Sequence, residues 1–189
     1  MKKIAFLISI ILLLNSCENV QRGGCTDPLA INFETSADFD DGSCLYVQGC
    51  TDPAAQNFDP LAVVEPVNAC LYKTNLVYYL DYSAAQYMIN WGISFYSFYD
   101  NFNNFIGDLS SDYYWTSPPN CIPQNDGSTL TTTLEWNGNY TNNSATFTWS
   151  AYPDDGPIAD YEYTEIVNPN ECVKLGLSKK KIQEFKQSK

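Results

Sequence analysis

The sequence predicts a mainly β protein: an antiparallel β-sandwich of about seven strands with a short C-terminal helix, preceded by two small disulfide-closed repeats. Three observations support this prediction. Residues 74–177 contain short segments in which apolar and polar side chains alternate, as along half-buried strands. A cysteine-containing motif occurs twice within residues 24–73. Six of the seven cysteines, all except Cys17, form an even set that suits three disulfides.

The chain begins with a segment typical of an export signal. Lys2 and Lys3 precede the apolar run 4–14. That run is too short to cross a bilayer core, which takes about 20 apolar residues. We therefore expect residues 1–16 to direct export and to be removed.

The residues that follow this run resemble the lipobox of bacterial lipoproteins. Leu14, Ser16 and Cys17 match it, whereas Asn15 replaces the more usual small or apolar residue. The resemblance implies a palmitate-type lipid anchor on Cys17, with residues 17–23 as a lipidated tether. Glu18, rather than Asp, implies the bacterial outer membrane, on either its periplasmic or its outer face. The alternative is an ordinary cleaved signal peptide that leaves Cys17 as a free thiol.

Composition excludes several functions. The chain has 22 acidic and 10 basic residues and a net charge of −12, which argues against nucleic-acid binding. It has no histidine, which removes Ser-His-Asp catalysis and His-ligated zinc. Arg22 is the only arginine, so guanidinium recognition of phosphate is excluded elsewhere. We therefore expect no enzyme.

The repeated motif reads Gly-Cys-Thr-Asp-Pro, then Asn-Phe, and closes with Cys-Leu-Tyr; its two copies occupy residues 24–47 and 48–73. Each copy is too short to bury a core, so symmetry predicts the disulfides Cys25–Cys44 and Cys50–Cys70. Each would close a loop of about 20 residues, worth roughly 3 kcal/mol. The copies resemble repeats of secreted and surface proteins of bacteria, which implies a spacer or adhesive-type module.

The first copy also suggests a metal site. Asp38, Asp40 and Asp41 precede Gly42, and clustered carboxylates on a turn suit calcium. The second copy lacks this acidic run, and the spacing does not follow the EF-hand pattern. A solvated acidic turn is the simpler alternative, and we expect no other cofactor.

Residues 74–177 are predicted to form the sandwich. The polar stretch 137–144, which begins Asn-Gly, is predicted to join two alternating segments as a hairpin. Residues 83–91 have helical spacing behind Ser83, and Ser178 is predicted to cap a basic helix within 178–189. The expected strands are 76–82, 93–99, 105–109, 129–136, 145–150, 161–167 and 172–177.

Cys121 and Cys172 are left to pair by exclusion, closing a loop of about 50 residues worth roughly 4 kcal/mol. The arrangement resembles small transthyretin-like or carboxypeptidase-regulatory-like sandwiches of secreted proteins, and the resemblance implies no functional residues.

Aromatic residues provide the candidate ligand site. Tyr113, Tyr114 and Trp115 are adjacent, and outward-facing rings can stack on sugars. Packing of aromatic rings in the core is the alternative.

Two groups of charged residues are also candidate sites, although solvated surface positions would explain both. One is a set of carboxylates that suits calcium or a glycosidase-like pair, namely Asp154, Asp155, Asp160, Glu162 and Glu165. The other is a basic cluster that suits lipopolysaccharide or another partner, namely Lys179, Lys180, Lys181, Lys186 and Lys189.

These observations support a membrane-anchored, non-enzymatic envelope lipoprotein in which a stapled stalk presents the sandwich for structural or adhesive contacts. A glycan-binding accessory lipoprotein is the second hypothesis. A hydrolase that uses two carboxylates is the third.

Overall fold

The computed structural model describes residues 20–124, 126–141 and 143–188. The predicted signal and Cys17 therefore lie outside the described residues, as does Lys189. The chain divides into two compact units, Met1–Val47 and Gln48–Lys189. The second predicted repeat thus belongs to the same unit as the sandwich.

The first unit contains one disulfide-closed repeat with little regular structure. Strands β1 (Gly23–Gly24) and β2 (Phe39–Asp40) pair in parallel. Cys25 pairs with Cys44 across a Cα separation of 4.8 Å, as predicted. A Cβ on Gly24 would lie 3.2 Å from that of Ala37, so the close approach of the chain here favours glycine.

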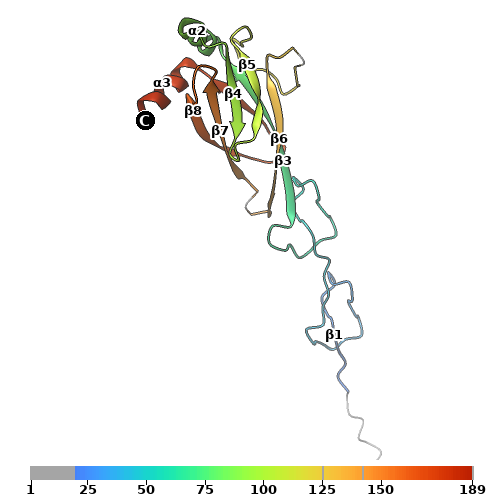
Figure 1. Ribbon diagram of the computed structural model, residues 1–189. Helices are drawn as coiled ribbons and strands as arrows, with labels where there is room; N and C mark the ends of the chain where they lie inside the picture. The colour runs from blue at the N-terminus through green and yellow to red at the C-terminus, as the bar shows by residue number, and fades with distance from the viewer. Residues whose placement is uncertain (1–19, 125, 142, 189) are drawn as a thin grey trace, which may run out of the picture. The chain divides into compact units, whose positions relative to one another are not determined.

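The second unit is a sandwich of two sheets, which confirms the predicted fold class (Figure 1). The three-stranded sheet has the order β6 (Leu130–Gly138), β3 (Cys70–Leu80), β9 (Cys172–Leu177). The four-stranded sheet has the order β5 (Phe105–Ser110), β4 (Phe95–Asp100), β7 (Ala145–Pro153), β8 (Tyr161–Val167). All pairings within these two sheets are antiparallel except that of β3 with β9, which is parallel.

Aromatic side chains fill the space between the sheets. Tyr78, Phe98 and Trp149 are fully buried, and their ring centroids lie 5.7–5.8 Å apart. Such pairs add roughly 0.5–1.5 kcal/mol beyond the area they bury. Packing in the core, the alternative given for the aromatic residues, therefore holds for these three rings, whereas Tyr113 and Tyr114 are exposed.

The predicted hairpin at residues 137–144 is wrong. β6 pairs with β3 over its full length, from Leu130 opposite Tyr78 to Gly138 opposite Cys70. β7 already has β4 on one edge and β8 on the other, so neither edge is free for β6. The connection therefore crosses from one sheet to the other, although both strands were predicted correctly.

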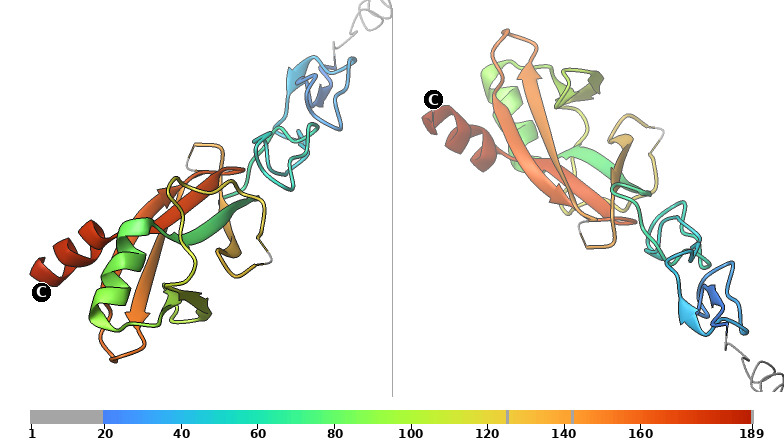
Figure 2. Two further views of the ribbon diagram at one scale, coloured as in Figure 1. Left: turned by 90° about the horizontal axis from the view of Figure 1, so that it is seen from above. Right: turned by 90° about the horizontal axis from the view of Figure 1, so that it is seen from below.

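Two helices lie side by side at one end of the sandwich (Figure 2). The first, α2 (Tyr82–Trp91), is capped by Asp81, whose carboxylate accepts from Ala84 N at 2.8 Å, and not by Ser83 as predicted. Ser83 instead accepts a hydrogen bond from Lys179 N at 3.1 Å, which links α2 to α3 (Lys179–Ser188).

Ser178 caps α3 as predicted, because its hydroxyl accepts from Lys181 N at 3.2 Å. No helix among the described residues is long and apolar enough to span a membrane.

The second repeat packs directly onto the sandwich. Cys70 is both the closing cysteine of the Cys50–Cys70 disulfide and the first residue of β3. Tyr72, two residues further on, is fully buried and lies 5.8 Å from the ring of Trp136 on β6. The boundary that the sequence suggests at residues 73/74 therefore falls inside a strand.

The third disulfide pairs Cys121 with Cys172, at a Cα separation of 6.0 Å. It ties the segment between β5 and β6 to the start of β9. All six cysteines outside the N-terminal segment are thus paired as the sequence predicts.

Candidate functional site

The Asp of each Gly-Cys-Thr-Asp-Pro motif holds its repeat closed. Asp27 accepts from the amide two residues later at 2.9 Å and from the Tyr46 hydroxyl at 2.8 Å. Asp52 accepts from the equivalent amide and from the Tyr72 hydroxyl, both at 2.8 Å. Only Asp52 has a third donor, Asn143 Nδ2 at 3.1 Å. Burial acts to raise the pKa of Asp52, but these hydrogen bonds outweigh it and hold the pKa below the usual value.

The asparagine that occurs at the same position in both copies, Asn32 and Asn57, also has a structural role. The Asn32 side chain bonds the carbonyl before Cys44 and the amide after it, both at 2.7 Å. Asn57 does the same around Cys70 at 2.7–2.8 Å. Each amide therefore fixes the backbone on both sides of a disulfide. The repeated Asp and Asn of the motif therefore both take part in closing the repeat.

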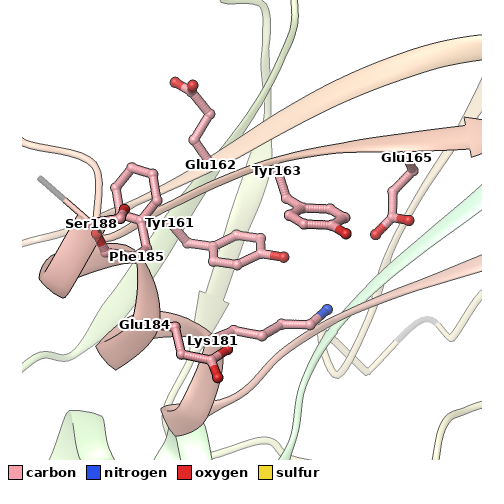
Figure 3. Close-up of a pocket in the computed structure, with 8 residues that line it drawn as sticks. All are labelled: Tyr161, Glu162, Tyr163, Glu165, Lys181, Glu184, Phe185 and Ser188. Carbon is pink, nitrogen blue, oxygen red and sulfur yellow. Dashed lines mark hydrogen bonds between the residues drawn. The ribbon is translucent and has the colours of Figure 1, made fainter.

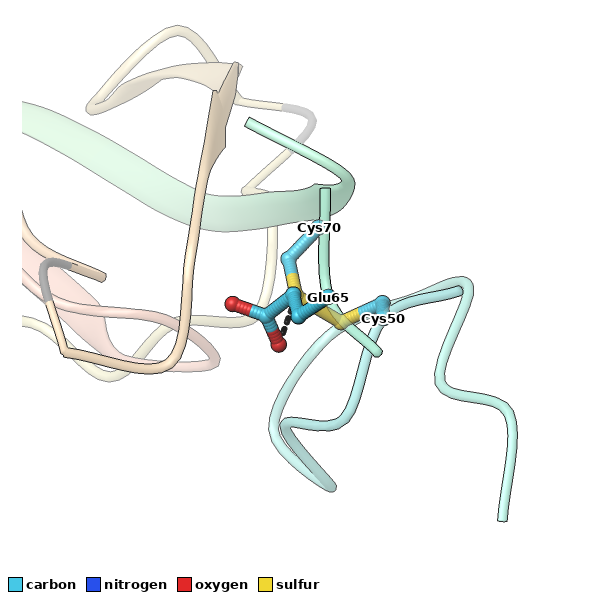
Figure 4. Close-up of side chains that lie close together, drawn as sticks. All are labelled: Cys50, Glu65 and Cys70. Atoms are coloured by element: carbon cyan, nitrogen blue, oxygen red, sulfur yellow. Dashed lines mark hydrogen bonds between the residues drawn. A yellow bond between two sulfur atoms is a disulfide. The ribbon is translucent and has the colours of Figure 1, made fainter. Parts of the chain in front are cut away.

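One group of side chains of types that can ligate a metal consists of a disulfide and a carboxylate. Among the described residues, only Cys50, Glu65 and Cys70 bring such a set of ligand atoms within 4.8 Å of one another. Both sulfurs are in a disulfide, so neither is a thiolate that could bind a metal (Figure 4). Glu65 is a structural link instead, because it accepts from Thr51 Oγ1 at 2.6 Å and from Tyr140 N at 2.8 Å.

The predicted calcium ligands do not converge. Asp38 accepts from Arg22 N at 2.9 Å, and Asp40 and Asp41 each accept from the amide two residues later at 2.9 and 3.0 Å. All three side chains are exposed. The acidic stretch is therefore built as a series of turns rather than as a cage of oxygens.

Tyr113, Tyr114 and Trp115 line a hollow of about 450 Å³, and their binding of a ligand stays a prediction. Trp115 is half-buried and donates from Nε1 to the Ser128 carbonyl at 3.1 Å. Tyr114 packs against Tyr82 with a centroid distance of 5.1 Å and an interplanar angle of 62°. Trp115 thus serves to fasten the loop.

The five predicted carboxylates do not form one group: Glu162 and Glu165 line a cleft, whereas Asp154 and Asp160 form hydrogen bonds elsewhere. Asp160 is 5% exposed and accepts from the Tyr96 hydroxyl at 2.6 Å and from Lys186 Nζ at 2.8 Å. Burial raises the pKa of Tyr96, and the hydrogen bond to Asp160 raises it further. Asp154 accepts from the Ser94 amide at 3.1 Å. The sequence did not reveal this ion pair between the buried Asp160 and the half-exposed Lys186, because the two residues are distant along the chain.

The basic cluster is likewise divided. Lys186 neutralises Asp160, Lys180 lies 3.7 Å from Glu184, and Lys181 Nζ donates to the Gly176 carbonyl at 2.8 Å. The described lysines of α3 therefore do not present one continuous basic face.

A cleft of about 530 Å³ lies between β8 and α3 (Figure 3). One wall consists of Tyr161 and Tyr163, whose rings are nearly parallel (19°) with centroids 6.1 Å apart. Glu165 follows on the same face of β8, because side chains alternate along a strand. In Figure 3 both tyrosine hydroxyls point toward the Glu165 end of the cleft, whereas Glu162 points away.

Lys181 forms the opposite side of this cleft. Its ammonium lies 5.5 Å from the ring centroid of Tyr161 and 5.9 Å from that of Trp149. Burial lowers the pKa of Lys181, and the charges of Glu165 and Asp81 offset part of that effect. The cleft thus combines aromatic, basic and acidic groups that the sequence places on separate elements.

Comparison with protein-family models, with curated proteins and with solved structures finds no match to this chain.

Proposed function

We propose that this chain is a non-enzymatic lipoprotein of the bacterial outer membrane, anchored through Cys17, whose β-sandwich makes structural or adhesive contacts with an envelope partner. The observation that carries the proposal is the cysteine pairing. Six cysteines form three disulfides within the chain, and the seventh is Cys17 in the lipobox-like segment. Disulfides of this density suit an oxidising compartment outside the cytoplasm.

A non-enzymatic function is supported by the missing histidine and by the hydrogen bonds and ion pairs that the carboxylates form. The chain has no histidine, and three of the carboxylates singled out by the sequence, Asp40, Asp41 and Asp160, close turns or pair with the half-exposed Lys186. A carboxylate that closes a turn or pairs with a lysine stabilises the fold in its ionised form, which is unfavourable for transferring protons.

Metabolic labelling tests the anchor. The full chain, expressed in a bacterial host with labelled palmitate, should carry the label and fractionate with the outer membrane. The matched Cys17→Ser variant should lose both properties while its three disulfides stay intact. Mass spectrometry that finds a free thiol at Cys17 in the mature protein would refute lipid anchoring.

Glycan binding is the second candidate function. It is favoured by half-exposed tyrosines beside two cavities, the hollow at Tyr113 and Tyr114 and the cleft at Tyr163. A glycan array probed with the purified protein tests it, and absence of any saccharide signal would remove it.

A further inference from the structure

We propose that the cleft between β8 and α3 binds a neutral saccharide, with Tyr163 as the stacking surface and with Glu165 and Lys181 as hydrogen-bonding groups. The proposal deepens the second candidate function and rests on it. It moves the site from the Tyr113–Trp115 loop to a different surface of the sandwich.

Tyr163 is the exposed ring of the stacked pair. Tyr161 is 3% exposed and belongs to the core, whereas Tyr163 is 52% exposed and borders the cleft. The ring of Tyr161 lies beside that of Tyr163 on the same face of β8, nearly parallel at a centroid distance of 6.1 Å. An aromatic face of this kind can accept the apolar C–H face of a sugar ring at little cost in side-chain entropy.

Polar groups with free capacity converge beside this ring. Among the described residues, neither the Tyr163 hydroxyl nor the Glu165 carboxylate forms a hydrogen bond. Lys181 Nζ uses one N–H for the Gly176 carbonyl, which leaves two donors. The cleft therefore offers acceptors and donors together, as a polyhydroxylated ligand requires.

The charges of the cleft favour a neutral ligand. A cationic ligand would meet the like charge of the Lys181 ammonium, which lies 5.5 Å from the ring centroid of Tyr161 at the inner side of the cleft. Anionic ligands are opposed by Glu165 and Glu184 in the cleft and by the net charge of −12. A neutral saccharide satisfies the remaining groups without burying a second charge.

The test uses the chain from residue 17 onward with Ser in place of Cys17, exported behind an ordinary cleavable signal peptide, so that no lipid is attached and no detergent is needed. Binding is screened on an array of neutral, uronic-acid-bearing and sulfated oligosaccharides, and the strongest neutral ligand is then titrated calorimetrically. Tyr163→Ala should weaken binding at least tenfold, and Glu165→Gln roughly tenfold, because each removes contacts that a sugar would use. Tyr163→Phe keeps the ring and should stay within about threefold of the parent.

Tyr140→Ala is the matched control, since this tyrosine is 61% exposed on the same unit and its backbone contact with Glu65 survives the change. It should bind as the parent does. Thermal melting confirms that each variant is folded, and Glu165→Gln tests the site independently if Tyr163→Ala does not fold.

Three results would overturn the inference: a preference for anionic glycans, neutral binding that Tyr163→Ala leaves unchanged, or binding that is lost on Trp115→Ala instead. The last two leave glycan binding in place and reject only this cleft. Absence of any binding rejects the cleft and the second candidate function together. Lipid anchoring is tested separately by labelling.

Discussion

Replacement of Asp52 by alanine should destabilise the second unit strongly, whereas the equivalent change at Asp27 should not. Asp52 is 3% exposed and accepts three hydrogen bonds at 2.8–3.1 Å. Its removal leaves the hydroxyl of Tyr72 buried without a partner, which costs about 1–3 kcal/mol. Loss of the two other hydrogen bonds, from Ala54 N and Asn143 Nδ2, adds about 1–2 kcal/mol, because water can reach these donors and replace part of each bond. We expect a total of about 2–5 kcal/mol.

The four tryptophans lie between positions 91 and 149, so their fluorescence reports only on the second unit. Urea denaturation followed in this way should show the full loss for Asp52→Ala and a change within about 0.5 kcal/mol for Asp27→Ala. Adding Tyr72→Phe should recover part of the loss, because it removes the unpaired hydroxyl. A loss below about 1 kcal/mol for Asp52→Ala would refute the claim that this buried bond set stabilises the unit.

Three further predictions concern stability. Gly176→Ala should lower the melting temperature, because a Cβ there would overlap the ring of Tyr79, and overpacking of this kind costs about 1–3 kcal/mol. The double variant Cys121→Ala/Cys172→Ala should lose about 4 kcal/mol in urea denaturation, since it frees a loop with a sequence separation of 51 residues. Stability should also fall as pH rises above about 10, the pKa of an unfolded tyrosine, because the raised pKa of buried Tyr96 means that the folded state holds its proton while the unfolded state releases it.

Each of these has a distinct control. A Gly176→Ala melting temperature equal to that of the parent would show that the Tyr79 ring moves aside freely. Chemical reduction of the parent breaks all three disulfides, so it is not an equivalent of the double variant. The free energies of unfolding of the variant and the parent must therefore be compared under oxidising conditions, in which the two other disulfides stay intact. Tyr96→Phe should reduce the slope of the alkaline limb by the share of one proton, about 1.4 kcal/mol per pH unit, because Tyr72, Tyr78 and Tyr161 also have raised pKa values and keep their shares. An unchanged slope would contradict the assignment to Tyr96.

The strands were predictable because their signal is local. The segments 161–167 and 172–177 were predicted with the bounds that the structure gives them, since alternation of side chains and flanking turns are written in neighbouring residues. The pairing of strands was less accessible. β6 and β7 are adjacent along the chain yet lie in different sheets, because the edges of β7 are taken by β4 and β8.

The candidate sites were likewise predictable only where their residues are neighbours in the sequence. The sequence selected Tyr113, Tyr114 and Trp115 because they are adjacent, and the structure keeps them adjacent but uses Trp115 to fasten a loop. The β8–α3 cleft was not predicted as a site, because Tyr163 and Lys181 come from separate elements and meet only after the helix folds back.

The sequence by itself determined which residues close the repeats, since symmetry between the two copies fixes the cysteine pairs. Only the tertiary structure decided that the copies differ in environment. Tyr46 and Tyr72 occupy equivalent positions, yet Tyr46 is half-buried whereas Tyr72 is fully buried beside Trp136. The physical reason is that burial depends on which surfaces pack together, and a motif of about 25 residues is too small to supply those surfaces alone.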